Sequence, residues 1–92
     1  MGKVMVDLRA RLRTALGKKQ VELTLEPGSN VKSLLELLSK EYPVLEPLLK
    51  GEMGKYGHLI IMVNNKKESL ERRVNDGDVV SILETVAGGM IK

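Results

Sequence analysis

Two consecutive glycines near the C-terminus, Gly88 and Gly89, are the residues whose type and spacing best suit chemistry. Glycine has no Cβ, so an extended Gly-Gly segment can enter a narrow enzyme channel and expose its carbonyl carbon to a nucleophile. The carboxylate of Gly89 is available only if that residue ends the chain, whereas Met90-Ile91-Lys92 follows it. For Gly89 to be a site of covalent attachment, a processing protease would have to remove Met90–Lys92; if these residues stay, this chemistry is not the function of the chain.

Other residues are weaker candidates for chemistry. The chain contains no cysteine, which excludes a thiol nucleophile, a thiolate metal site and a disulfide framework. Its one histidine, His58, has no partner at the spacing of metal ligands, so we predict no metal site and no cofactor. Asp76 and Asp78 flank Gly77, and carboxylates in such a position hold a turn more often than they transfer protons.

The composition indicates one small domain. A chain of 92 residues can bury a single modest core, and its 42% hydrophobic residues with charges of mixed sign argue against disorder. The longest apolar run, Leu59–Val63, is too short to span a membrane, and the N-terminus lacks the apolar segment of a signal peptide. We therefore expect a cytoplasmic protein with no membrane partner.

The basic residues are densest between positions 9 and 19, in a chain whose net charge is +3. Such a cluster could contact nucleic acid or an acidic protein partner. A solvated face is the simpler interpretation, and we do not expect nucleic acid as a partner.

Apolar periodicity predicts the elements of the N-terminal half. Residues 4–8 and 20–26 alternate as two strands of an antiparallel pair, and residues 10–16 between them form either a helical turn or a loop. The apolar stripe of residues 31–38 predicts a helix that Asn30 caps and that Pro43 ends near residues 41–42. A short second helical piece is predicted over residues 44–49.

The C-terminal half predicts further strands. Leu59–Val63 is apolar throughout, which indicates a central strand covered on both faces, with Met62 filling the core. Turns follow at residues 64–65 and 75–78. In the last strand, residues 79–84, we expect Val80 and Ile82 to face the core and Leu83 to be exposed. Strands on either side of one main helix indicate an α+β fold.

These elements, with Asp76-Gly77-Asp78-Val79-Val80 and then Val86-Ala87-Gly88-Gly89, resemble the ubiquitin-like sulfur carriers of the MoaD (molybdopterin synthase small subunit) and ThiS type over residues 3–89. The resemblance implies an α+β fold of the β-grasp class, in which a mixed sheet of four to five strands lies over one main helix. It implies one domain over residues 1–84 and a flexible diglycine tail over residues 85–92.

The resemblance also implies that the chain is a protein cosubstrate and not an enzyme. An E1-like adenylating enzyme would activate the carboxylate of Gly89, and a sulfur donor would convert the acyl-adenylate into a thiocarboxylate. The large subunit of molybdopterin synthase would then use this sulfur in molybdopterin or tungstopterin synthesis. Val86, Ala87 and Gly88 would form the recognised tail, and we expect Leu83 and Arg13 to lie on the docking face.

Other functions remain open. The chain could be a ubiquitin-like modifier that is joined through Gly89 to lysines of conjugation targets, or a carrier for tRNA thiolation, and the Met90–Lys92 extension favours this class. It could instead be a non-covalent binding module on a β-grasp scaffold, because a fold alone does not fix a function. In that case Gly88 and Gly89 would simply end the chain without chemistry.

Overall fold

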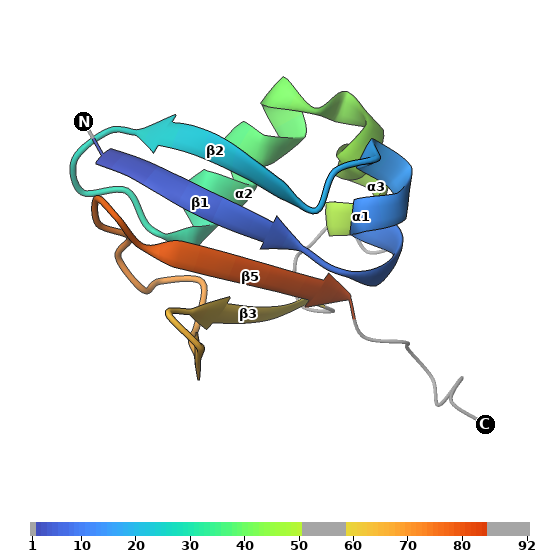
Figure 1. Ribbon diagram of the computed structural model, residues 1–92. Coiled ribbons are helices and arrows are strands. Elements are labelled where there is room, and N and C mark those ends of the chain that lie inside the picture. The colour runs from blue at the N-terminus through green and yellow to red at the C-terminus, as the bar shows by residue number, and fades with distance from the viewer. Residues whose placement is uncertain (1, 51–58, 85–92) are drawn as a thin grey trace.

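A mixed five-stranded sheet with one main helix across it forms the two layers of the molecule (Figure 1). The computed structural model describes residues 2–50 and 59–84. Its elements, in chain order, are β1 (Gly2–Leu8), α1 (Ala10–Leu16), β2 (Gln20–Leu25), α2 (Val31–Glu41), the 3-10 helix η1 (Pro43–Leu45), α3 (Glu46–Lys50), β3 (Leu59–Val63), β4 (Lys66–Lys67) and β5 (Val79–Glu84).

The strands are arranged in the order β2-β1-β5-β3-β4. β1 pairs antiparallel with β2 and parallel with β5, while β3 pairs antiparallel with both β5 and β4. The predicted antiparallel pair at the N-terminus and the α+β, β-grasp class with a mixed sheet are confirmed.

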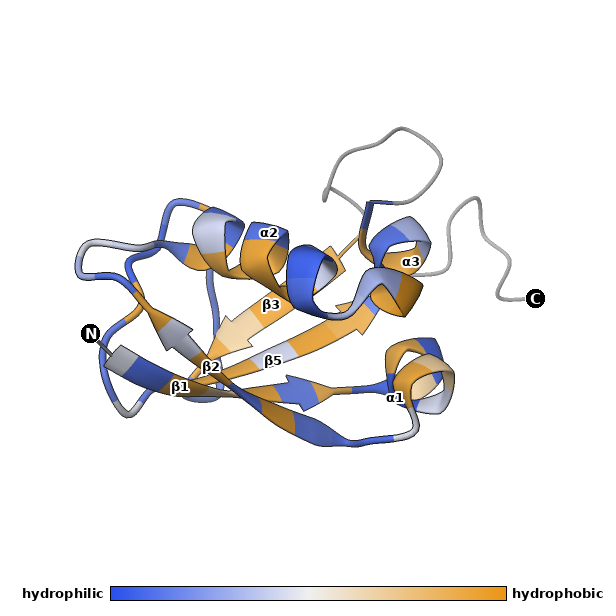
Figure 2. Cartoon of the chain, turned by 90° about the horizontal axis from the view of Figure 1, so that it is seen from above, coloured by the Kyte–Doolittle hydropathy of each residue, from blue (hydrophilic) through white to orange (hydrophobic). Residues whose placement is uncertain are grey.

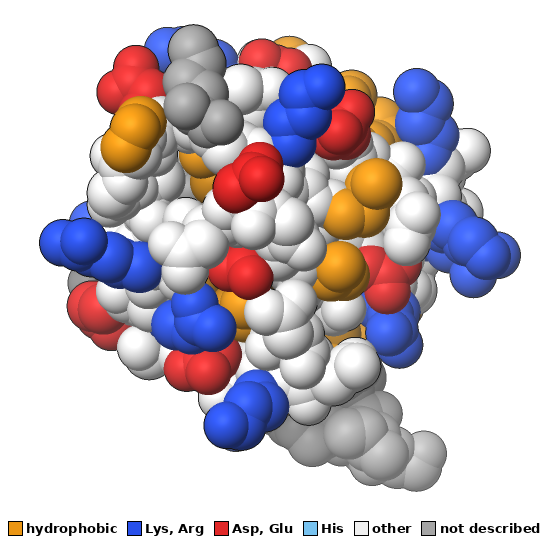
Figure 3. Space-filling view, turned by 60° about the vertical axis from the view of Figure 1, so that its left-hand side comes forward, with side chains coloured by type: hydrophobic (Ala, Val, Ile, Leu, Met, Phe, Trp, Pro, Cys, Tyr) orange, Lys and Arg blue, Asp and Glu red, His pale blue; other side chains and the backbone are white. Residues whose placement is uncertain are grey.

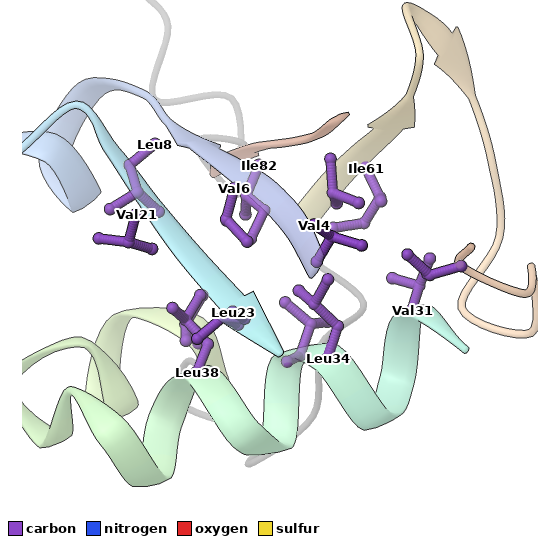
Figure 4. Close-up of a cluster of buried hydrophobic side chains, with 14 of the residues drawn as sticks. Val4, Val6, Leu8, Val21, Leu23, Val31, Leu34, Leu38, Ile61 and Ile82 are labelled. Atoms are coloured by element: carbon purple, nitrogen blue, oxygen red, sulfur yellow. The ribbon is translucent and has the colours of Figure 1, made fainter. Parts of the chain in front are cut away.

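The core lies between α2 and one face of the sheet, and it is entirely aliphatic (Figure 4). The predicted stripe of α2 is fully buried, and the strand residues that face it alternate with exposed ones. Each such side chain contributes about 1.5–3 kcal/mol on burial. The fully buried residues with the largest side chains are Leu8, Leu12, Leu34, Leu35, Leu38, Leu45, Leu49, Ile82, Val4, Val6, Val31 and Val63.

The ends of α2 follow from single residues. The Oδ1 atom of Asn30 accepts a hydrogen bond of 2.9 Å from the backbone N–H of Ser33, as predicted for an N-cap. The helix ends at Glu41, because Pro43 disfavours helical backbone in the residue before it. The predicted second helical piece is present as η1 and α3.

Residues 10–16 form a helix, α1, which settles the choice between helix and loop. Leu12 anchors it in the core, and Gly17 closes it in a left-handed conformation with φ of 81°. The N–H of Gly17 donates to the carbonyl of Arg13 at 2.8 Å. Figures 1 and 2 place α1 at the end of the sheet where β5 ends.

Two expectations about β3 are wrong. The central strand is β5, between β1 and β3, and the described helices cover only one face of the sheet. Because alternate residues of a strand point to opposite faces, burial of Ile61 and Val63 in the core directs Met62 to the other face, where it is half-buried. Met62 therefore does not fill the core.

The predicted turns are confirmed. Asn64 and Asn65 join β3 to β4 with φ of 53° and 71°, values that asparagine tolerates better than most residues. Gly77 has φ of 89° in the turn before β5. These turns set the register in which β5 enters the sheet.

Candidate functional site

The candidate site begins where β5 ends. The tail residues Val86, Ala87, Gly88 and Gly89, together with Met90–Lys92, lie outside the described residues. What the structure describes is the strand end that carries them, Ile82–Glu84, which we call the tail root. Because β5 pairs along both edges with β1 and β3, this root is built on the best-supported strand of the sheet.

Helix α1 fixes the tail root from one side. The backbone N–H of Arg9 donates to the carbonyl of Ile82 at 3.2 Å. Nε of Arg11 lies 3.3 Å from Oε1 of Glu84, whose side chain is only 13% exposed. A backbone hydrogen bond from the N-cap of α1 and an ion pair from α1 itself therefore join this segment to the tail root.

Beside the tail root, the face of the sheet opposite α2 carries an apolar patch. Leu83 pairs with Ile60, Ser81 with Met62, and Val79 with Met5, so these residues share one face. Leu83 and Val79 are 38% and 39% exposed, and the others are half-buried except for Ser81, which is buried. We define the apolar patch as Met5, Ile60, Met62, Val79 and Leu83.

The patch covers only half of this face. On the β1–β2 side the same face carries Asp7, Glu22 and Thr24, which are polar. Figure 2 shows the corresponding contrast, with β3 and β5 mainly hydrophobic and β1 and β2 alternating. Figure 3 shows a part of the surface where basic and acidic side chains are interspersed with small apolar groups. The partly exposed apolar residues of β3 and β5, with polar residues beside them on β1 and β2, are typical of a surface that docks a partner.

Of the two predicted docking residues, Leu83 is exposed as expected and lies in the apolar patch. Arg13 is also exposed, but it lines a different region, a surface hollow of about 310 Å³ that it forms with Thr14, Gly17, Lys18 and Lys19. The structure places these two residues on different surfaces near the same end of the molecule. Their roles in docking stay predictions.

Asp76 and Asp78 hold the turn before β5. Oδ1 of Asp76 accepts from the backbone N–H of Lys3 at 2.8 Å. Oδ2 of Asp78 accepts from the N–H of Asn75 at 2.8 Å, and its Oδ1 accepts from Nδ2 of Asn64 at 2.9 Å. Both carboxylates therefore have structural partners, in agreement with the sequence interpretation.

These contacts shift the pKa of the Asp78 carboxyl. Burial raises the pKa of its carboxyl, but hydrogen bonds from Asn75 and Asn64 and the nearby guanidinium of Arg72 outweigh this effect. The net result is a pKa below the ordinary value of 3.8. Asp78 is thus ionised at neutral pH and is not suited to act as a proton donor there.

Sequence reasoning missed several parts of the site. Arg11 belongs to the predicted basic cluster, but its ion pair with Glu84 does not follow from the sequence, because it depends on α1 folding back onto the end of β5. Ile60 and Met62 were assigned to a doubly covered strand, so their place in the apolar patch was also missed. Residues 59–63 alternate between the core face and the opposite face of the sheet, but the sequence does not show this because all five residues are apolar.

The described part of the chain contains neither a metal cluster nor a membrane-spanning helix. Within residues 2–50 and 59–84, no three His, Asp or Glu side chains lie close enough together to hold a metal ion. His58 lies outside these ranges. No helix in the same ranges is long and apolar enough to cross a bilayer.

Comparison with known proteins supplies the family. A sequence model of the ThiS family matches residues 6–89. Among curated proteins, no sequence match was found. Solved structures give many matches that cover nearly the whole chain.

Three of these structures are informative. The small archaeal modifier protein 1 (SAMP1) from Methanosarcina acetivorans is 32% identical with a TM-score of 0.77, over 97% of this chain and 98% of that one. A chain in the BexX/CysO complex from Amycolatopsis orientalis is 30% identical with a TM-score of 0.71, over 94% and 99%. The putative molybdopterin converting factor subunit 1 from Pyrococcus furiosus is 28% identical with a TM-score of 0.74, over 94% and 100%.

The family match covers most of the chain and ends at Gly89, and the matched structures share the fold over nearly the whole chain. This protein therefore belongs to the ThiS family, within the ubiquitin-like sulfur carriers and modifiers.

Proposed function

We propose that this protein is a sulfur carrier whose C-terminal Gly89 becomes a thiocarboxylate, and that its sulfur serves molybdopterin or tungstopterin synthesis in the cytoplasm. The observation that carries the proposal is that the family match ends at Gly89 and leaves Met90–Lys92 beyond it. The similarity to a putative molybdopterin converting factor subunit supports the choice of pathway.

The chemistry requires activation by a partner. A carboxylate is a poor electrophile, so an oxygen of the Gly89 carboxylate would attack the α-phosphate of ATP, with pyrophosphate as the leaving group. A sulfide donor would then attack the carbonyl carbon of the acyl-adenylate, and AMP would leave to give the thiocarboxylate. A thiocarboxylate needs no cysteine in the carrier, which fits a chain that contains none.

The architecture supports delivery to a buried active site. The tail root is fixed by β1, β3 and α1, and the stretch from Glu84 to Gly89 can extend about 20 Å. Val86, Ala87 and Gly88 would lie in the channel of the E1-like adenylating enzyme. Leu83 and the rest of the apolar patch would dock on the enzyme outside that channel.

The test is reconstitution with purified components. The full chain and a form ending at Gly89 are incubated with an E1-like adenylating enzyme from the same organism, ATP and sulfide, and intact mass is measured. We expect the exchange of one oxygen for sulfur only in the form that ends at Gly89. A Gly89→Ala variant of that form is the matched control, because the added Cβ obstructs a close approach to the carbonyl.

Two results would contradict the proposal. One is a protein isolated from its own cells that always ends at Lys92 while the cofactor pathway is active. The other is a form ending at Gly89 that gives no acyl-adenylate with any E1-like enzyme of the organism. Either result would favour a non-covalent β-grasp binding module.

A second candidate is a protein modifier or a carrier for tRNA thiolation. The observation that favours it is 32% identity to a protein named small archaeal modifier protein 1. Both candidates use Gly89, so they differ in the acceptor. Conjugates on protein lysines, detected as Gly-Gly remnants after digestion, would support the modifier, whereas sulfur transfer to a pterin-binding large subunit would support cofactor synthesis.

A further inference from the structure

Positive charge is concentrated in one short segment. Residues 9–19, which we call the basic segment, contain five of the fifteen basic residues and no acidic residue. The remaining ten basic residues share the rest of the chain with all twelve acidic residues. The net charge of +3 therefore comes entirely from this segment, and the remainder of the molecule is slightly acidic.

The cations of the basic segment fall into two groups. Arg9 pairs with Asp7 at 3.2 Å and Arg11 pairs with Glu84, so these two are partly neutralised. Arg13, Lys18 and Lys19 are exposed and form no ion pair with any residue of 2–50 or 59–84. These three line the surface hollow of about 310 Å³ together with Thr14 and Gly17.

The hollow lies at the same end of the molecule as the tail root. The hydrogen bond from Arg9 to Ile82 and the ion pair from Arg11 to Glu84 attach α1 to the end of β5. Figures 1 and 2, seen from directions 90° apart, both show α1 and the end of β5 at the same end of the molecule. A protein that takes up the residues after Glu84 would therefore meet the end of the molecule at which these cations lie.

We infer that the hollow formed by Arg13, Lys18 and Lys19 docks an acidic surface of the protein partner that activates the tail. This inference rests on the function proposed above. The complementary charges would act mainly by raising the rate of encounter and by orienting the tail towards the active site, because exposed charges at the rim of an interface change association rates more than they change contact energy.

A protein partner fits these observations better than nucleic acid. Tyr42 is the only aromatic residue in the described ranges, and it lies at the C-terminal end of α2, outside the lining of the hollow. The hollow thus lacks the aromatic side chains on which single-stranded bases stack. The three exposed cations of the hollow also fall short of the roughly 6–10 phosphate contacts that give strong salt-dependent binding to duplexes.

The test compares two charge-reversal variants of the form that ends at Gly89. The first carries Arg13→Glu, Lys18→Glu and Lys19→Glu; the control carries Lys32→Glu, Lys40→Glu and Lys66→Glu, which change net charge equally at exposed positions on α2 and β4. The assay measures acyl-adenylate formation by the E1-like enzyme at salt from about 0.05 to about 0.3 M, a range over which screening of exposed charges becomes substantial.

For the first variant at low salt we expect the KM for the carrier to rise about tenfold, with kcat within about twofold of the unsubstituted form. High salt should remove most of this difference by raising the KM of the unsubstituted form. The control variant should stay within about threefold in KM at every salt concentration. Circular dichroism on all variants checks that they are folded. A second basic-segment variant carries Arg13→Gln, Lys18→Gln and Lys19→Gln, which removes the three positive charges without reversing them.

Several results would overturn the inference. An unchanged KM in both basic-segment variants, with adenylation proceeding, would overturn it while leaving the proposed function intact. If the unsubstituted form binds a single-stranded RNA oligonucleotide and the basic-segment variants do not, while their KM in adenylation is unchanged, the hollow binds nucleic acid instead. Failure of the unsubstituted form to be adenylated at all would refute the proposed function, and the inference with it.

Discussion

The two faces of β5 have the same chemical character but opposite environments. Ile82 points towards α2 and is completely buried, whereas its neighbour Leu83 points the other way and is 38% exposed. Val80 and Val79 repeat this contrast at the start of the strand, with Val80 buried and Val79 exposed. The buried face is matched by a helix of the same chain, and the apolar patch on the other face has no such cover among the described residues.

This difference separates two kinds of apolar residue. Residues on the core face decide whether the chain folds, because their burial supplies most of the free energy of folding. The partial exposure of the apolar patch costs the folded monomer little free energy, and it leaves these side chains available to a partner. Stability and partner binding should therefore respond to different substitutions within a single strand.

The largest expected effect comes from truncating the core face. Ile82→Ala should reduce the free energy of unfolding by about 3 kcal/mol, because a fully buried side chain leaves a cavity under α2. Leu83→Ala should cost less than about 1 kcal/mol, because its side chain is already partly hydrated. Urea unfolding followed by circular dichroism measures both. Equal losses in the free energy of unfolding for the two variants would contradict the proposed difference between the two faces.

The turn before β5 should have the next largest effect, since it sets which residues face the core. In Asp78→Asn one amide oxygen replaces two carboxylate oxygens that accept from Asn75 and Asn64, so we expect a loss of about 1–2 kcal/mol at neutral pH. The amide is also uncharged, which removes the attraction between this position and Arg72. Urea unfolding at neutral pH measures the loss.

The same variant gives a pH dependence with a definite sign. The pKa of Asp78 is lower in the folded protein than its ordinary value of 3.8, so its charge stabilises the fold above that value. This contribution should disappear as the pH falls through the lowered pKa. Unfolding curves recorded from neutral to acidic pH should therefore show the stability difference between wild type and variant shrinking below about pH 4. A difference that grows on acidification would contradict the assignment.

The cap of α2 should have a smaller effect. Asn30→Ala removes the side-chain acceptor for the N–H of Ser33, and we expect a loss of about 1 kcal/mol. Asn30→Asp serves as the matched control, because an aspartate can accept the same hydrogen bond and should retain most of the stability. Thermal unfolding distinguishes the two. A loss in Asn30→Asp as large as that in Asn30→Ala would show that the cap bond is not what matters.

The sequence allowed much of this fold to be predicted, because local signals and tertiary packing agree. The alternation in residues 20–26, the stripe of α2 and the cap at Asn30 each identify an element from its own residues. The turns at residues 64–65 and 75–78 predict where β3 ends and where β5 begins. The family resemblance then joined these elements into a β-grasp fold.

What could not be predicted depends on which strands are neighbours. The uniformly apolar run at residues 59–63 has no alternation to show that Ile60 and Met62 leave the core, and only the pairing of β3 with β5 shows it. The ion pair between Arg11 and Glu84 joins residues far apart in sequence through α1. Both features define the surroundings of the tail root, so the core was more predictable than the candidate site.

The smallest expected effect on stability is also the sharpest test of the apolar patch. Leu83→Ser should change the free energy of unfolding by no more than about 1 kcal/mol, because the side chain is partly exposed. If the patch docks the adenylating enzyme, the same change should weaken binding about tenfold or more, since an apolar anchor at the centre of an interface contributes more than a rim residue.

The matched control is Val44→Ser. Val44 is the most exposed large apolar residue described, at 53%, and it lies on η1, on the helical side of the molecule and away from the apolar patch. Isothermal titration of the E1-like enzyme with both variants should show weaker binding for Leu83→Ser alone. Equal affinities would mean that exposed apolar residues on the two sides of the sheet are equivalent to the partner, and docking would then have to be assigned to the basic segment and the tail without the patch.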